Sequence, residues 1–313
     1  MSGISSTTAY ATVLSGMLTA QTAQAKATAQ ISSGETATDL QGYAGQASTL
    51  LALQSVQSQT NSYLANSQTT ANVLSAQDLA FTQLNDSASS ATSAITDALA
   101  SGSGDTLMQS LGTSFQDAVS ALNTNFDGQY LFSGGAVNTQ PTTATSMSDL
   151  TTAPSIASLF QNGDNVSTAQ LNSSTTVQTG FLANQLGTNL YSAYQSIQAY
   201  TETNGAFSSP LTAAQTSFLQ STLATFKSTN TQLTTAQAQN GLVQQQVTQA
   251  QTTLTDQQTT LSGLVSNISS ANVAQASTNL EQAQYAIQAS SQAFLALQTS
   301  TNTLMSLLQS AGA

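Results

Sequence analysis

Residues 219–268 read LQSTLATFKSTNTQLTTAQAQNGLVQQQVTQAQTTLTDQQTTLSGLVSNI, and apolar residues recur in this stretch at a fixed spacing. One register of every seventh residue is apolar with a single exception: Leu219, Phe226, Leu233, Asn240, Val247, Leu254, Leu261 and Ile268. Apolar residues sustained at this spacing form a continuous stripe along a helix and are typical of coiled coils. The stretch therefore predicts a long helix that buries its stripe against another helix.

The exception, Asn240, has two interpretations of equal weight. A polar residue at a core position of a coiled coil can fix the register of the paired helices. Alternatively, Asn240 marks a place where the stripe faces water.

A second register takes over after Ile268. It begins at Val273 and continues through Leu280, Ile287 and Phe294, with a companion row three residues further on. The helix that runs from about residue 210 to residue 310 is therefore expected to bend or break near 267–271, where the register changes.

The N-terminal part carries patterns that match this long helix. Residues 4–31 predict a weaker, alanine-rich amphipathic helix, and residues 31–45 interrupt it with three glycines and helix-capping side chains. A second long pattern covers 53–95 and stops at the glycines of SGSGD, where Asp105 is expected to cap the next helix, over 106–126.

The centre of the chain, about 127–185, has a different character. It contains Pro141 and Pro154 and long runs of Ser, Thr, Asn and Gly, which favour short strands and loops over a long helix. The fold class is therefore expected to be mainly α. An elongated antiparallel helical bundle or coiled coil, formed by the N- and C-terminal segments, would carry a small β- and loop-rich central insert.

This layout predicts three domains. Residues 1–44 and 269–313 would form a terminal coiled-coil assembly domain, because their alanine-rich stripes supply little burial and need neighbouring copies to complete them. Residues 45–135 and 181–268 would form the bundle of the single chain, and 136–180 an outward-facing insert.

Composition excludes two classes of partner. The 313 residues carry two bases, Lys26 and Lys227, no Arg, and 13 acids, for a net charge of −11. Binding to nucleic acid or to anionic lipid needs clustered Lys and Arg, so neither partner is expected. No apolar run approaches the roughly 18 residues that a membrane span requires.

Catalysis and metal binding are not expected either. The chain has no Cys and no His, the usual nucleophile, acid–base group and metal ligands, and no motif pairs a Ser with a base. The pairs Asp127–Gly128 and Gly163–Asp164 lack the ligand spacing of a calcium-binding EF-hand. We therefore predict no catalytic residue, no cofactor and no metal.

Three segments resemble a known family. The first is FDGQYLFSGGAVNTQP (126–141), in which the motif is Tyr130, Leu131, Phe132, Gly134 and Gly135. The second is QISSGE (30–35), and the third is SNISSANVAQASTNLEQAQYAIQASSQAFLALQTSTNTLMSLLQ (266–309). In order and position these segments resemble the flagellin superfamily, most closely its hook-associated protein 3 branch, the hook–filament junction proteins.

The resemblance implies a structural subunit of the bacterial flagellum that joins hook to filament and assembles through its terminal helices. It implies a helical or ring-shaped homo-oligomer as the product, and other hook-associated proteins, flagellin and a flagellar export chaperone as partners. It also implies an extracellular location, reached through the flagellar type III channel without a cleaved signal peptide. The alternatives are a filament flagellin and, less favoured, a surface adhesin or binding fibre.

The chain departs from the family in charge. Basic residues that usually follow the ISSG-type segment are absent from ETATDLQGYAG (35–45), and most charged residues of the terminal helices are replaced by Gln, Ser, Thr or Ala. This favours assembly through packing and amide hydrogen bonds. The residues expected to pack between subunits are Leu14, Leu18, Leu280, Ile287, Phe294, Leu297 and Leu304.

Overall fold

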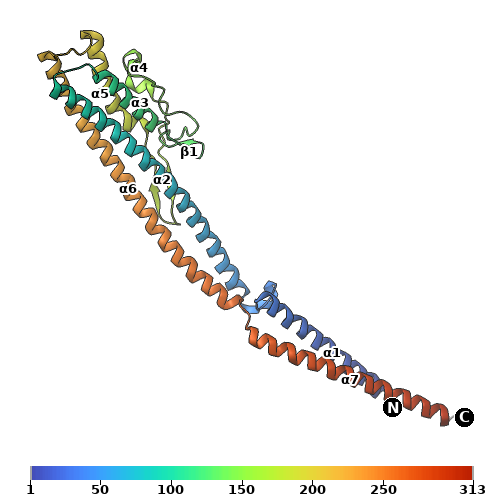
Figure 1. Cartoon of the computed structure of the whole chain (residues 1–313). Coiled ribbons are helices and arrows are strands. Elements are labelled where there is room, and N and C mark those ends of the chain that lie inside the picture. Colours follow the sequence, from blue (N-terminus) through green and yellow to red (C-terminus); the bar gives the residue numbers. More distant parts are fainter. Residues whose placement is uncertain (1, 312–313) are drawn as a thin grey trace. The chain divides into compact units, whose positions relative to one another are not determined.

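The structure, a computed structural model, describes the backbone of residues 2–311, and the side chains of residues 8–303, 305–307 and 309–310. The long helices are α1 (Ser2–Ser33), α2 (Ala47–Ser101), α3 (Leu107–Leu122), α5 (Ala183–Asn204), α6 (Ala213–Ser269) and α7 (Val273–Ala311) (Figure 1). The short elements are η1 (Leu40–Gln46), α4 (Met147–Thr152), η2 (Ile156–Leu159) and two hairpins, β1–β2 (Asn125–Phe126, Gln129–Tyr130) and β3–β4 (Thr168–Gln170, Thr176–Gln178). The expected mainly α fold with a small β insert is confirmed.

The chain forms two compact units. The first contains Met1–Gln59 and Gln257–Ala313, and the second contains Thr60–Asp256. The division into three domains stays a prediction, and the two units are described separately below.

In the first unit, α1 and α7 lie side by side and antiparallel (Figure 1). The centre of their contact consists of small side chains, because Ala20 and Ala27 of α1 and Ala283 of α7 are almost completely buried. Towards the chain termini the rings of Tyr10 and Phe294 meet edge to face, with centroids 5.5 Å apart. Alanine lets two helices approach closely but buries little apolar area, so this pair gains little stability per residue.

The break between α6 and α7 lies where the change of register predicted it, between Ser269 and Val273. The segment that follows α1 forms backbone hydrogen bonds with the residues between α6 and α7. The Thr36 N–H donates to the Ser269 carbonyl at 2.7 Å, and the Ala271 N–H donates to the Gly34 carbonyl at 2.8 Å. These bonds satisfy backbone groups that a continuous helix would have paired internally.

In the second unit, α2 and α6 run antiparallel (Figure 1). Six members of the heptad register face the interior with at most a few per cent of their surface exposed: Leu219, Phe226, Leu233, Asn240, Val247 and Leu254. Asn240 is completely buried, and its Nδ2 donates to the Leu74 carbonyl of α2 at 2.9 Å. The solvent-exposed interpretation of Asn240 is therefore wrong, because the side chain is buried between α2 and α6 and forms a hydrogen bond from one helix to the other.

The largest core lies where α3 and α5 cover α2 and α6. Phe115 of α3 packs on Tyr191 and Tyr194 of α5, with ring centroids 5.1 and 5.2 Å away. The Tyr194 hydroxyl donates to the Ser114 Oγ at 3.0 Å. Burial raises the pKa of Tyr194 to about 12, so this donor keeps its proton at neutral pH.

The hairpin β3–β4 packs on the same two long helices at another height. Leu171 and Val177 of the hairpin region form a small buried cluster with Leu74 of α2 and Val247 of α6. The Asn66 Nδ2 also donates to the Gln170 carbonyl at 2.6 Å. The central part of the chain is therefore anchored on the bundle.

Two local expectations were wrong. Thr106, not Asp105, is the N-cap of α3, while the Asp105 carboxylate accepts a hydrogen bond from Ser103 Oγ at 2.9 Å. The predicted helix over 106–126 ends at Leu122, because Asn125 and Phe126 pair with the strand β2 instead.

Candidate assembly site

The described residues contain no group of three or more Asp or Glu side chains that could hold a metal ion. In the same part of the chain, no helix is both long and apolar enough to cross a bilayer. The features that the sequence pattern and the resemblance single out are the surfaces of the α1–α7 pair and the YLFSGG segment.

Leu14 and Leu18 lie on a face of α1 that α7 leaves uncovered. Their side chains are 52 % and 55 % exposed, in contrast to Ala20 and Ala27 on the covered face. Two exposed leucines one turn apart form an apolar strip that a second chain can cover. A contact between subunits requires such exposed side chains. The sequence pattern that predicted this contact did not distinguish the two faces of α1.

The other predicted residues lie along the seam between α1 and α7. Leu280, Ile287 and Leu297 are half-buried, and Phe294 is 39 % exposed while one side of its ring contacts Tyr10. These side chains therefore contribute to the pair within one chain and still present surface outside. The side chain of Leu304 lies outside the described residues.

Sequence reasoning missed a set of exposed apolar side chains on α7. Tyr285 is 71 % exposed and Leu295 is 57 % exposed, and Met305 and Leu307 are similarly accessible. They lie outside the heptad rows, so a search for the helix-pairing stripe passes over them. Large apolar side chains outside the pairing stripe of an otherwise polar helix were the available signal.

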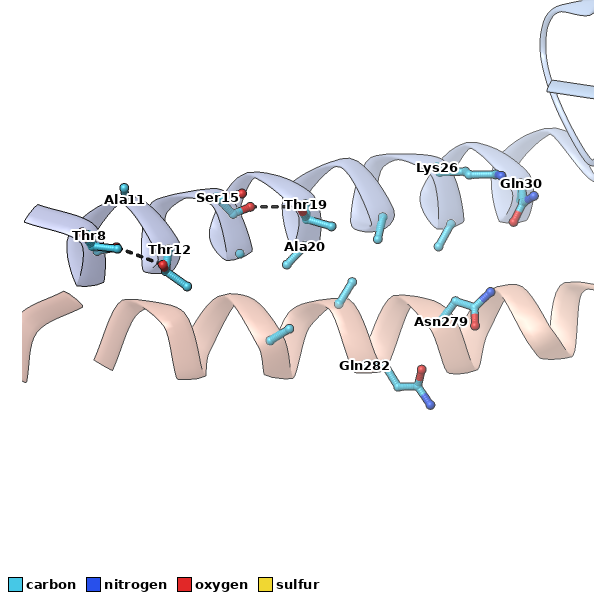
Figure 2. A pocket seen from close by; sticks show the side chains of 15 residues that line it. Thr8, Ala11, Thr12, Ser15, Thr19, Ala20, Lys26, Gln30, Asn279 and Gln282 are labelled. Atoms are coloured by element: carbon cyan, nitrogen blue, oxygen red, sulfur yellow. Dashed lines mark hydrogen bonds between the residues drawn. The ribbon is translucent and has the colours of Figure 1, made fainter. Parts of the chain in front are cut away.

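A groove of about 970 Å³ runs along one flank of the pair (Figure 2). Apart from Lys26 and Gln30, its wall on α1 consists of small or short side chains, and Asn279, Gln282 and Ala286 of α7 form part of the other wall. Lys26 lies towards one end on the α1 wall, beside Gln30, and Asn279 lies on the opposite wall (Figure 2). Thr12 and Thr19 turn their hydroxyls back to the carbonyls of Thr8 and Ser15 at 2.9 Å, which leaves methyl groups to line the groove.

The YLFSGG segment joins the insert to the bundle. Asp127 and Gly128 both have positive φ in the two-residue turn of the hairpin β1–β2, which ends at Tyr130. Phe132 lies beyond this strand. Phe132 is fully buried, 5.6 Å from the ring of Phe81, and its carbonyl accepts the Ala183 N–H at the start of α5.

Of the motif residues, Tyr130 and Leu131 are half-buried, while Gly134 and Gly135 follow the buried Ser133 into a tight turn. The Ser133 carbonyl accepts the Gly163 N–H from within the insert at 2.8 Å, and Ser133 also forms a β-bridge with Leu182 at the insert's exit. The motif thus brings the entry and exit of the insert together beside α5.

We predict that Gly134→Ala destabilises the second unit by at least about 2 kcal/mol, because a left-handed backbone and overpacking each carry a cost of that order. Gly134 has φ +61°, and a Cβ there would lie 2.6 Å from the Gly163 carbonyl oxygen and 2.7 Å from Leu182 Cδ2. Urea denaturation of the full chain measures the loss. The matched control is Gly112→Ala within α3, where a Cβ meets nothing within 4 Å. Equal stability of the two variants would contradict the prediction.

Comparison with known proteins agrees with this architecture. Residues 223–308 match the family described as the bacterial flagellin C-terminal helical region. The resemblance to the flagellin superfamily is thereby confirmed. No curated protein matches the chain.

Two solved structures share the fold of this flagellin-like chain. One is a protein assigned as a flagellar hook-associated protein from Vibrio parahaemolyticus, with a TM-score of 0.58 and 14% identity over 71% of this chain and 96% of that chain. The other is FlgL from Bacillus cereus, with a TM-score of 0.51 and 18% identity over 69% of this chain and 99% of that chain. Together with the family match, this likeness supports a structural role in a bacterial flagellum.

Proposed function

We propose that this chain is a structural subunit of the bacterial flagellum that joins hook to filament as a hook-associated junction protein. The observation that carries the proposal is the fold likeness, which covers almost the full length of the Vibrio hook-associated protein. The YLFSGG segment supports it, because its buried Phe132 and tight Gly134 turn give the motif an architectural role at the base of the insert.

The subunit assembles through its terminal helices. The α1–α7 pair buries few large side chains within one chain and exposes Leu14 and Leu18 on one helix and Tyr285 and Leu295 on the other. Contacts between two different surfaces of identical subunits produce rings when the rotation closes and helical assemblies when it does not. Other hook-associated proteins and flagellin contact the ends of this assembly.

The remaining parts of the proposal follow from the flagellar role. The subunit acts outside the cell and reaches its place through the flagellar export channel without a cleaved signal peptide, escorted by an export chaperone. Its role is structural and non-enzymatic.

A filament flagellin is the second candidate, and one observation favours it. The family that matches residues 223–308 is described by flagellin itself and not by a hook-associated protein. A surface adhesin has no comparable support.

Immunogold labelling of intact flagella with an antibody against residues 136–180 separates these candidates. We expect a single cluster of gold where hook meets filament. Label along the whole shaft would identify a filament flagellin. Label elsewhere on the cell surface, with none on flagella, would overturn the flagellar role. A strain that lacks the gene gives the background of the antibody.

A further inference from the structure

The groove on the α1–α7 pair has a single cation, Lys26, among its lining residues. The α1 groove is defined here by Thr8, Thr12, Gly16, Thr19, Ala23 and Lys26. Lys26 is exposed and makes no ion pair with any described residue. It is also the only base in the sequence of the first unit, so a partner that fills the groove meets small side chains and one positive charge.

The outer side of α7 has the complementary features. The α7 ridge is defined here by Glu281, Tyr285, Gln288, Gln292 and Leu295, which recur every three or four residues and are all exposed. Two of them are large and apolar, and Glu281 is the single charge on α7. No ridge residue lines the groove, so one chain can offer both surfaces at once.

The two surfaces also match in length. Glu281 and Leu295 are 14 residues apart (295 − 281), as are Thr12 and Lys26 (26 − 12), which is about 21 Å along a helix in both cases. When Glu281 is placed opposite Lys26 and the helices run antiparallel, Gln288 falls at Thr19 and Leu295 at Thr12.

The antiparallel register also fixes the relative direction of the two copies. Because α1 and α7 are antiparallel within a chain, a neighbouring α7 that runs antiparallel to α1 is parallel to the α7 of the chain that receives it. Every copy then points the same way, as repeated heterologous contacts require.

We propose that the α7 ridge of one copy docks in the α1 groove of a second copy, with Glu281 paired to Lys26. This rests on the proposed self-assembly and names its surfaces. Covering Tyr285 and Leu295 supplies apolar burial, and the charge pair fixes register and direction. In a surface so poor in charge, one pair discriminates strongly between correct and shifted registers.

Charge reversal tests the pairing on the purified full chain. We expect Lys26→Glu and Glu281→Lys each to raise the threshold concentration for assembly at least about tenfold, because each puts like charges opposite one another. The double variant is expected to return to within about threefold of the wild type. Light scattering and sedimentation measure the threshold.

The matched control is Glu35→Lys combined with Lys26→Glu. Glu35 belongs to the segment after α1 and, like Asp39, borders a smaller pocket that also contains Lys26, so it is a competing partner within the chain. Rescue by Glu35→Lys, or no rescue by Glu281→Lys, would overturn the proposal. Single variants that assemble like the wild type would overturn the docking and leave the structural role intact. A wild-type chain that never assembles would overturn both.

Crosslinking tests the register separately. The chain has no native Cys, so single cysteines react without background. When Thr12→Cys chains are mixed with Leu295→Cys chains of different tag size and oxidised, we expect the mixed disulfide to exceed either symmetric one. Leu14→Cys replaces Thr12→Cys as the control on the other face of α1. A control that links to Leu295→Cys as readily as Thr12→Cys does would contradict the register.

Discussion

Phe294→Asp is expected to stop the chain from assembling while the second unit stays folded. The Phe294 ring contacts Tyr10 across the α1–α7 seam and is 39 % exposed, so it belongs both to the pair and to the surface that neighbours cover. A carboxylate at this position loses the ring contact and must be desolvated in any assembly that covers it. We expect a loss of roughly 3 kcal/mol or more per contact, which corresponds to about a hundredfold rise in the assembly threshold.

The control for Phe294→Asp is Leu242→Asp, which introduces the same charge at an exposed leucine of α6 in the second unit. It is expected to assemble at nearly the wild-type concentration. Near-ultraviolet circular dichroism, to which most aromatic residues of the second unit contribute, should keep most of its wild-type signal in both variants, and the urea midpoint of the second unit should be unchanged. Normal polymers of Phe294→Asp would rule out the terminal seam as the assembly surface.

Sequence periodicity predicted the second unit well because burial there is strong and one-sided. From Leu219 to Leu254 every member of the heptad register is buried, and the predicted break after Ile268 is present. A helix that packs on large apolar partners along one side has apolar residues at regular helical spacing, and this pattern can be read from the sequence.

Asn240 is a position whose burial could not be predicted from residue spacing. An asparagine in a heptad row has the same spacing whether it is buried or solvated. Its state depends on whether the facing helix offers a partner, and here that partner is a backbone carbonyl, at Leu74. Backbone groups of another element have no sequence signature, so the alternatives could not be separated.

The first unit was harder to predict because α1 carries two stripes. Tyr10, Val13 and Met17 lie on the side that α7 covers, whereas Leu14 and Leu18 are exposed. In a helix rich in Ala, Ser and Thr, both faces have similar hydropathy, and spacing cannot say which partner each face meets. A subunit that pairs within the chain and again between chains is expected to have this ambiguity.

The α1 groove and the α7 ridge could not be predicted from the sequence for a related reason. The groove is lined by residues of two helices that are distant in sequence, α1 and α7, so the sequence alone does not show that Lys26 belongs to it. The YLFSGG segment was noticed because its aromatics and glycines are rare in this chain. The place of Phe132 depends on burial against Phe81 and not on strand pairing, and this contact has no signature in the local sequence.

Phe115→Ala is expected to cause a large loss of folding stability in the second unit, about 3–5 kcal/mol. Phe115 is completely buried between Tyr191 and Tyr194, and Ser114 next to it accepts the Tyr194 hydroxyl. Truncation leaves a cavity between two tyrosines whose hydroxyls are held in place by hydrogen bonds, to Thr142 and to Ser114, so the core cannot close easily over the gap.

Urea denaturation monitored by near-ultraviolet circular dichroism measures the effect of Phe115→Ala, and Leu79→Ala at an exposed position of α2 is the control. We expect a clear drop in the midpoint for Phe115→Ala and less than about 0.5 kcal/mol for the control. A loss below about 1 kcal/mol would mean that the tyrosines repack and that the aromatic cluster is not the main source of stability. The contrast with Phe294→Asp then separates the two roles of aromatic residues in this chain. Phe115 is expected to change the stability of a single subunit, whereas Phe294 is expected to change the association of many.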